Sequence, residues 1–249
     1  MKKLLKKLMR LIPAQPMYCL LNLCALIVLR MARFIALAYT NLSGSFDLPW
    51  FDHRFDWLRG PENWVWNERG IYGAKLIRPG DKVLDICCGD GIYSGLYYSM
   101  FAGLVHAIDR DERGLSLARK RYSRENVKFF KVDVTKEDFP LENYDVILMF
   151  AAIEHFSVEQ GTQILQRIAR ALSASSNGSF LGSTPIFDEA TGHGHPEHVN
   201  EFTSIEQLQN FLSPHFAEIE FWSSKWGLIG ERKDTYFLCK KPIVHEKKN

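Results

Sequence analysis

The residues with the clearest chemical meaning lie in residues 83–91, the stretch VLDICCGDG. A short apolar run is interrupted there by an acid, Asp85, and ends in a glycine-rich turn. Glycine lets the backbone turn sharply and approach a bound molecule closely, and a buried carboxylate needs a partner because desolvating its charge is costly. Ligands of open α/β sheets bind at the carboxyl ends of strands, so this stretch predicts a buried strand followed by a ligand-binding turn. The turn residues expected at the ligand are Cys87, Cys88, Gly89 and Gly91.

A second acid ends the next apolar run, LVHAI, which covers residues 104–108. An acid at such a strand end, about 20 residues beyond a glycine-rich turn, accepts hydrogen bonds from ribose hydroxyls, because a carboxylate offers two acceptor oxygens to two vicinal donors. Asp109 is therefore predicted to bind a ribose, and Arg110 to lie along the adenine face. The alternative, a cap for the helix expected near Glu112, explains the position of Asp109 less well.

The first stretch resembles the first motif of class I S-adenosylmethionine-dependent methyltransferases, in which an acid precedes a glycine-rich turn. The resemblance implies that the turn packs against the methionine part of S-adenosylmethionine and that Asp85 helps to place its amino group. Cys87 departs from the family pattern, which has its first glycine at this position. The rival pattern, the dinucleotide fingerprint G-x-G-x-x-G, fits Gly89 and Gly91 but has Ser94 at its third position.

The next two predicted strands, residues 127–132 and 144–150, extend the same site. The resemblance implies that the acid after the first of them hydrogen-bonds the adenine amino group; a turn or helix-cap role is the alternative. The crevice of an α/β sheet opens between strands one and four, so residues at the end of the fourth strand are predicted to line the cofactor pocket. The cofactor residues added in this way are Asp133, Val134, Phe150 and Ala151.

The acceptor side is predicted at the end of the fourth strand and in a histidine-rich loop. Methyl transfer from a sulfonium needs in-line alignment of the nucleophile and, for a hydroxyl, removal of its proton, for which histidine is the natural base near neutral pH. His155, beside Glu154, matches a Glu-His pair that many family members carry, and the stretch around His198 is similar to a family substrate loop. We predict all three as catalytic or substrate-contacting residues. A helix cap and a solvated loop are the alternatives.

The same side chains allow a metal interpretation. Glu154, His155, His195 and His198 offer carboxylate and imidazole ligands, and some methyltransferases that act on vicinal hydroxyls use a divalent ion. The ligands would come from two distant segments without a tight motif. The sequence therefore favours no metal site, and S-adenosylmethionine is the cofactor that we predict.

Strand-like and helix-like segments alternate through the rest of the chain, which predicts a parallel sheet with right-handed crossovers. The expected fold class is α/β: a Rossmann-like, seven-stranded, mostly parallel sheet with helices on both faces, as in the family, plus an N-terminal apolar and amphipathic helical extension. The expected domains are a membrane-associating segment at 1–40, an aromatic-rich lead-in or lid at 41–76, the methyltransferase domain at 77–241 and a polar tail at 242–249.

Residues 2–39 differ in composition from the rest of the chain. Residues 2–12 form a basic amphipathic pattern, and residues 17–29 are almost wholly apolar. A transmembrane helix needs about 20 apolar residues, and a longer run would place Arg30 inside it at a cost of about 2.5–3.5 kcal/mol. We therefore favour membrane attachment, either as a peripheral anchor or as a span, over a secretory signal peptide and over a helix packed on the domain or on another subunit.

Aromatic side chains crowd residues 45–66, where we predict a packed lid or core. In related methyltransferases the segment before the first strand closes over the cofactor. Arg69, in the following helix, has the donors to hold the cofactor carboxylate. A surface ion pair with Glu68 or Glu62 is the favoured interpretation.

Composition limits the remaining classes. A chain of 249 residues suits one α/β domain with an appendage, and a net charge of +2 gives no argument for a nucleic-acid partner. Five cysteines without zinc-type spacing favour a reducing compartment. We predict a cytoplasmic enzyme, attached to the cytoplasmic face of a membrane, that methylates a small-molecule or glycan/lipid-linked acceptor at oxygen. A non-catalytic cofactor-binding or scaffold protein and a nucleotide-dependent oxidoreductase are the alternatives.

Overall fold

The computed structural model describes residues 14–43, 52–59, 64–172, 178–187, 197–226 and 232–244. The chain divides into two compact units, residues 1–48 and residues 49–249. The expected basic helix at 2–12, His195 and most of the polar tail lie outside the described residues.

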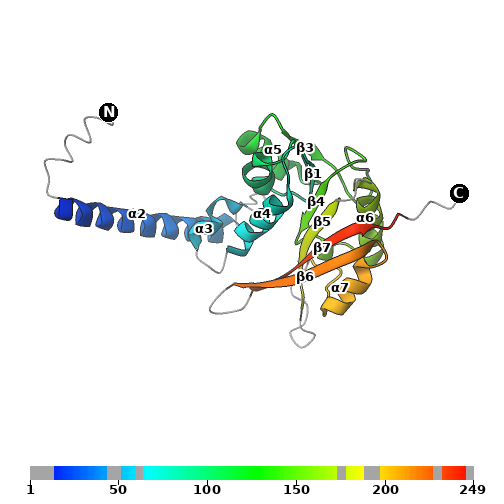
Figure 1. The fold of residues 1–249 in the computed structure, drawn as a ribbon. Helices are drawn as coiled ribbons and strands as arrows, with labels where there is room; N and C mark the ends of the chain where they lie inside the picture. The colour runs from blue at the N-terminus through cyan, green and yellow to red at the C-terminus, as the bar shows by residue number, and fades with distance from the viewer. Residues whose placement is uncertain are drawn as a thin grey trace. The chain divides into compact units, whose positions relative to one another are not determined.

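The second unit is built on a seven-stranded sheet with the order β3-β2-β1-β4-β5-β7-β6 (Figure 1). The pairs among β1 to β5 are parallel, and β7 is antiparallel to both β5 and β6. This confirms the predicted fold class. The strands are β1 (Lys82–Ile86), β2 (Leu104–Asp109), β3 (Val127–Lys131), β4 (Val146–Phe150), β5 (Ser179–Pro185), β6 (Phe216–Trp226) and β7 (Arg232–Pro242).

Helices cover both faces of the sheet (Figure 1). Side chains of a strand alternate between faces, so Leu84 of β1 packs in the core beneath α6 and α7, whereas Val83 packs in the core beneath α4. Because both faces of these strands are buried, side chains that point to either face are apolar, and the strands appear in the sequence as nearly continuous apolar runs. The main helices are α4 (Trp64–Leu76), α5 (Glu112–Tyr122), α6 (Val158–Ala171) and α7 (Ile205–Leu212).

The helix expected after Gly91 is irregular. It is a π-helix over Tyr93–Tyr97 (η3) followed by a 3-10 turn over Tyr98–Met100 (η4). Its close packing requires a glycine at one point, because a Cβ on Gly95 would lie 2.2 Å from Cβ of Tyr122. Single-turn π-helices concentrate at functional sites, and this one follows directly on the glycine-rich turn.

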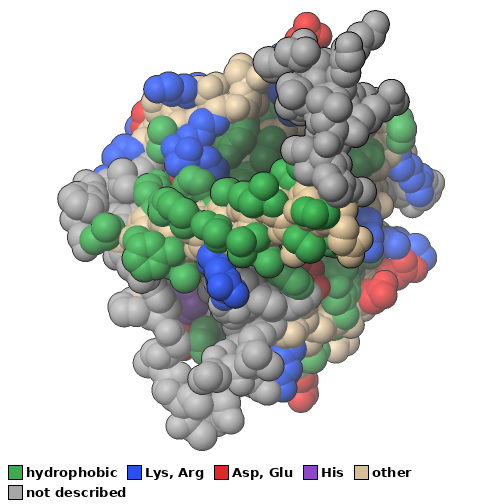
Figure 2. Space-filling view, turned by 90° about the vertical axis from the view of Figure 1, so that its left-hand side faces the viewer, with side chains coloured by type: hydrophobic (Ala, Val, Ile, Leu, Met, Phe, Trp, Pro, Cys, Tyr) green, Lys and Arg blue, Asp and Glu red, His purple; other side chains and the backbone are tan. Residues whose placement is uncertain are grey.

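Within the first unit, α2 (Ala14–Ser43) is one continuous helix of 30 residues that includes Arg30 and Arg33. Pro16 lies in its first turn, where the missing N–H costs nothing. The part over Gln15–Tyr39, 25 residues, is long and apolar enough to cross a membrane, a test that a signal sequence would also pass. Figure 2 looks toward this helix and shows hydrophobic side chains gathered on it. Its exposed large apolar residues include Leu20, Leu23, Ile27, Val28, Phe34 and Ile35.

Candidate active site

The turn after β1 is shaped by three residues in the left-handed backbone region: Cys87 at φ 57°, Gly89 at φ 55° and Gly91 at φ 73°. Glycine adopts this region freely, but a side chain costs roughly 1–2 kcal/mol there. The departure of Cys87 from the family's glycine is therefore a strained substitution. The side chain of Cys87 packs against the core beneath α6, which offsets part of that cost. The neighbouring Cys88 is buried, and its N–H donates to the Ile108 carbonyl at 3.0 Å.

Asp85 lies at the end of β1 with only 3% of its surface exposed. One carboxylate oxygen accepts a hydrogen bond from the Ser94 hydroxyl at 2.5 Å. The pKa of Asp85 is raised to about 7, mainly by burial; the Ser94 hydrogen bond opposes the rise, and the neighbouring Asp109 and Asp90 add to it. A carboxylate in this position favours a cationic ligand, and the amino group of S-adenosylmethionine is one.

Asp109 ties the end of β2 to the turn. Its two carboxylate oxygens accept backbone N–H groups, one from Gly89 at 2.9 Å and the other from Asp111 at 2.9 Å. The side chain of Asp111, not of Asp109, caps α5 by accepting the Arg113 N–H. The cap alternative for Asp109 is therefore wrong. Each carboxylate oxygen keeps acceptor capacity, which fits the donors of a ribose.

The remaining predicted cofactor residues are less sharply defined. The Asp133 carboxylate accepts from the Thr135 hydroxyl at 2.6 Å and N–H at 3.0 Å, and these bonds with the neighbouring Lys136 lower its pKa to about 2. A local turn thus accounts for its contacts. Val134 is buried and Arg110 is exposed. Their cofactor roles stay predictions.

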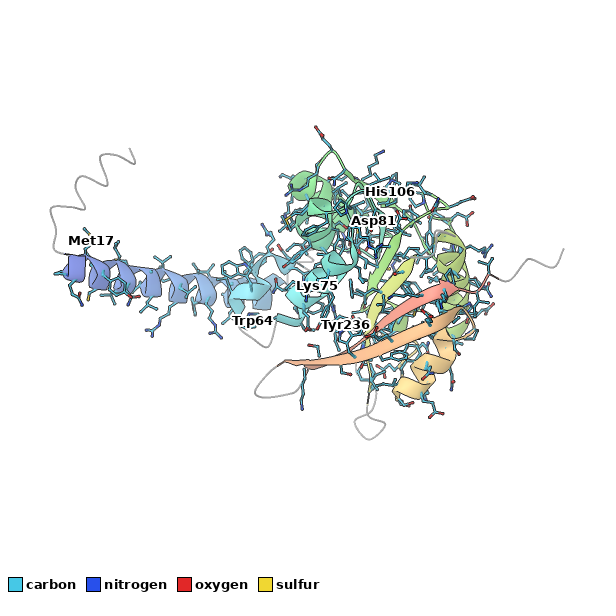
Figure 3. All side chains as sticks on the ribbon, in the orientation of Figure 1. Met17, Trp64, Lys75, Asp81, His106 and Tyr236 are labelled. Carbon is cyan, nitrogen blue, oxygen red and sulfur yellow. The ribbon has the colours of Figure 1, made fainter. Side chains whose placement is uncertain are left out.

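Phe150 and Ala151 lie at the end of β4, as expected. Phe150 is edge-on to Tyr93 and to Tyr236, with ring centroids 6.4 Å and 6.3 Å apart. Tyr236, labelled in Figure 3, comes from β7 and donates to Glu68 of α4 at 3.2 Å. Ala151 has φ 43° and donates its N–H to the Ser183 carbonyl. Aromatic side chains therefore pack beside the end of β4, where the ligand crevice was predicted.

The aromatic lead-in packs on the glycine-rich turn, a contact that sequence reasoning missed. The N–H of His53 donates to the Asp90 carboxylate at 3.1 Å. The His53 ring stacks on Tyr93 at 5.7 Å and lies 4.8 Å from the Trp66 ring. Asp90 lies within the GDG turn, but its partner lies 37 residues upstream, so only the folded chain pairs them.

Arg69 is buried, which contradicts the favoured surface ion pair with Glu68 or Glu62. Its Nε donates to Asp234 of β7 at 2.9 Å and its Nη2 at 2.5 Å, and the guanidinium lies 4.3 Å from the Trp66 ring centroid. Arginine and aspartate are 165 residues apart in sequence. Their pairing fixes α4 against the antiparallel end of the sheet.

On the acceptor side, the structure brings Glu154, His155 and His198 together. The N–H groups of Val199 and Asn200 donate to the Glu154 carbonyl at 2.9 and 3.0 Å, which fastens the loop to the end of β4. The rings of His155 and His198 lie 4.9 Å apart, nearly perpendicular. Neither Glu154 nor His155 caps α6.

The cap of α6 is Ser157, which forms a capping box with Gln160. Glu154 is 1% exposed, and its carboxylate accepts from the Thr184 hydroxyl at 3.0 Å. Burial raises the pKa of Glu154 to about 7. A buried acid beside two histidines can bind a polar acceptor, move a proton or hold a cation.

Comparison with known proteins finds similarity to methyltransferases. Residues 83–175 match the family described as a methyltransferase domain. Over 141 residues the chain is 27% identical to 2-phytyl-1,4-naphtoquinone methyltransferase of Nostoc sp., which covers 53% of this chain and 59% of that protein. Over 115 residues it is 31% identical to phosphoethanolamine N-methyltransferase of Plasmodium falciparum, covering 43% of this chain and 42% of that protein. The matches thus span about half the length of these relatives.

Among solved structures, the N-methyltransferase NodS from Bradyrhizobium japonicum, in complex with S-adenosyl-L-homocysteine, has the same fold. It superposes with a TM-score of 0.62 at 16% identity, covering 82% of this chain and 98% of that one. Residues 83–175 therefore carry a methyltransferase domain, and the strand order together with the acid-then-glycine turn after β1 is that of the class I S-adenosylmethionine-dependent methyltransferase fold.

Proposed function

We propose that this protein transfers a methyl group from S-adenosylmethionine to an oxygen of a small-molecule or glycan/lipid-linked acceptor close to a membrane. The main observation behind the proposal is that the candidate cofactor residues and the candidate acceptor residues lie at the same edge of the sheet. Asp85 and Asp109 lie at the ends of β1 and β2, and Glu154 and His155 directly follow β4, which pairs with β1.

The cofactor site follows from charge and hydrogen bonding. When bound, S-adenosylmethionine supplies a methyl group already activated by the positive sulfur. Asp85 would accept from its ammonium group and Asp109 from its ribose hydroxyls, because both carboxylates have acceptor capacity beyond the contacts they make. The turn between them brings backbone rather than bulky side chains to the cofactor.

His155 is the proposed base for the acceptor hydroxyl. Its Nδ1 lies 3.2 Å from the Glu197 carbonyl oxygen, which can only accept, so Nδ1 carries the proton. In the neutral ring Nε2 then holds a lone pair able to take a proton. His198 is oriented in the same way by Glu201, at 3.0 Å from its Nδ1. Two oriented imidazoles favour an acceptor that must lose a proton, as a hydroxyl must.

Two features support an acceptor near a membrane. The helix α2 exposes a long apolar surface, and 25 residues of helix span about 37 Å, enough for a bilayer core of about 30 Å. The matched relatives include methyltransferases named for a phytyl naphthoquinone and for phosphoethanolamine. S-adenosylmethionine is a cytosolic metabolite, which supports a catalytic unit on the cytoplasmic side.

The direct test incubates the purified full chain with S-adenosylmethionine carrying a labelled methyl group and with a membrane extract. We expect label in a single lipid-soluble or lipid-linked product, attached through oxygen by NMR of the isolated compound. Label on nitrogen or carbon would overturn the oxygen assignment. Failure to bind S-adenosyl-L-homocysteine in calorimetry would overturn the enzyme assignment and leave a scaffold protein.

Membrane attachment is tested by charge placed on α2. Replacing Leu20, Leu23 and Ile27 with glutamate in the full chain should move the protein from the membrane to the soluble fraction. A matched control replaces three exposed residues of the second unit, Val158, Val199 and Ile205, with glutamate. Equal partition of both variants and the parent would contradict the attachment.

A further inference from the structure

The acceptor-side residues form a compact set of metal ligands. Glu154, His155 and His198 each offer one ligand atom, and the three atoms lie within 4.8 Å of one another. Ligand atoms about 2.0–2.1 Å from a tetrahedral ion are about 3.3 Å apart. Small rotations of the three side chains, well within ordinary side-chain motion, would therefore bring them around one ion.

The histidines are held in the way that metal-binding histidines are usually held. Such residues donate the ring N–H that does not face the metal to a carbonyl or a carboxylate. Nδ1 of His155 lies 3.2 Å from the carbonyl of Glu197, and Nδ1 of His198 lies 3.0 Å from Oε1 of Glu201. Both acceptors fix the tautomer with the lone pair on Nε2.

The carboxylate of the set is buried beside a hydroxyl rather than beside a paired cation. Glu154 is 1% exposed and accepts from the Thr184 hydroxyl at 3.0 Å. Arg69 is a positive charge that acts on Glu154, but its Nε and Nη2 donate to Asp234. A divalent ion at the histidines would offset the cost of burying the Glu154 charge.

We propose that Glu154, His155 and His198 bind one divalent first-row transition ion, of which Zn²⁺ is the reference case. Imidazole and carboxylate ligands suit zinc, iron and nickel, whereas magnesium and calcium prefer all-oxygen sites. Two histidines and one glutamate leave a coordination position open, as in catalytic zinc sites. This revises the expectation, from sequence, of no metal site.

The open position defines what the ion would do. A hydroxyl of the acceptor bound there would have its pKa lowered by the ion, so that it loses its proton to water; with the ion bound, His155 acts as a ligand in place of the role as a base proposed for the metal-free site. This use of the ion rests on the proposed function. The binding of the ion does not, and it is measured without S-adenosylmethionine and without an acceptor.

The test uses the full chain without a polyhistidine tag, treated with a chelator and then freed of it. Calorimetric titration with Zn²⁺ should give one ion per chain, and Co²⁺ should give visible absorption bands typical of nitrogen and oxygen ligands. Replacing His155 and His198 together with alanine should weaken Zn²⁺ binding at least 100-fold. Glu201→Gln should weaken it about 10–100-fold, because Glu201 orients a ligand without being one.

The control replaces His193 and His195 with alanine, two histidines that precede His198 closely in the sequence. That variant should keep its Zn²⁺ affinity within threefold. Circular dichroism and S-adenosyl-L-homocysteine binding report whether each variant is folded. If the alanine variant does not fold, Glu201→Gln provides the test, because it retains all three ligands. The proposal is overturned if the parent binds no ion, or if the alanine variant binds Zn²⁺ within threefold of the parent.

Discussion

Two parts of the shared carboxyl edge of the sheet are built in different ways: the part at residues 87–91 and Asp109, here called the cofactor edge, and the part at Glu154, His155 and His198, here called the acceptor edge. At the cofactor edge, backbone conformation defines the site: the turn at residues 87–91 takes left-handed angles, and Asp109 binds it through a backbone N–H. At the acceptor edge, side chains define the site, because Glu154, Thr184 and His198 come from three separate segments. Substitutions at the first edge should therefore affect stability and cofactor affinity together, whereas substitutions at the second should affect chemistry alone.

The largest expected effect tests the acceptor edge. His155→Gln removes the proposed base and should lower kcat roughly 10²–10⁴-fold, with the Kd for S-adenosyl-L-homocysteine and the urea midpoint unchanged. Glutamine keeps a donor near the Glu197 carbonyl, so the loop should remain in place. Steady-state kinetics and calorimetry check this. A parallel loss of cofactor affinity would mean that the two edges are not separable.

At the cofactor edge, Asp109→Ala should weaken S-adenosyl-L-homocysteine binding about 100-fold, because charged hydrogen bonds contribute about 1.5–3 kcal/mol each. The matched control is Asp111→Ala, which removes the cap of α5 and should cost about 1 kcal/mol of stability while leaving affinity unchanged. Calorimetry and urea unfolding distinguish the two. Equal affinities for both variants would refute the ribose role of Asp109.

Gly91→Ala tests the backbone character of the cofactor edge. A Cβ there would lie 2.7 Å from Cβ of Ala118 and 2.7 Å from the Phe129 ring, at φ 73°. We expect a loss of about 3 kcal/mol in the free energy of unfolding, from strain and overpacking together. Gly80→Ala is the control: its φ is 94°, but no atom lies within 4 Å of the added Cβ. It should lose only about 1 kcal/mol, and equal losses would rule out the packing contribution.

The raised pKa of Asp85 predicts a pH dependence with a definite sign. Its pKa is about 7 in the folded chain against 3.8 ordinarily, so the folded state binds the extra proton between these values. The free energy of unfolding should then fall as pH rises from about 4 to about 7. Asp85→Asn lacks this loss, so its stability relative to the parent should rise by on the order of 4 kcal/mol between pH 4 and pH 8 without cofactor. Urea unfolding at pH 4 and pH 8 checks it; identical pH profiles would contradict the assignment.

The smallest expected effect concerns Cys87. Cys87→Gly relieves the left-handed strain at φ 57° but gives up packing against the core beneath α6 and adds flexibility to the unfolded chain. The net gain in stability should be about 0.5 kcal/mol. Thermal unfolding measures it, with Cys88→Ala as a control that removes a buried side chain and should destabilise. A destabilised Cys87→Gly would show that packing outweighs strain at this position.

The sequence by itself determined the local and periodic features. Apolar runs that contain or end at Asp85 and Asp109 predicted β1 and β2. Burial on both faces and a glycine-rich turn can each be recognised from a few consecutive residues. The count of seven strands in a mostly parallel sheet came from the family resemblance and is confirmed. Strand lengths are less evident from the sequence: the apolar pattern predicts strands only at residues 217–222 and 235–239, whereas antiparallel pairing from Phe216↔Pro242 to Trp226↔Arg232 prolongs β6 and β7 beyond them.

Only the tertiary structure decided which side chains meet. Arg69 pairs with Asp234, His53 packs over the turn at Asp90, and Glu154 meets His198 across a loop. These partners are 37 to 165 residues apart, and hydrophobic periodicity carries no record of such pairs. It reports the burial of a position, whereas a contact depends on which loops return to the same sheet edge. The cofactor edge could therefore be predicted from one local motif, whereas the contacts of the acceptor edge are seen only in the folded chain.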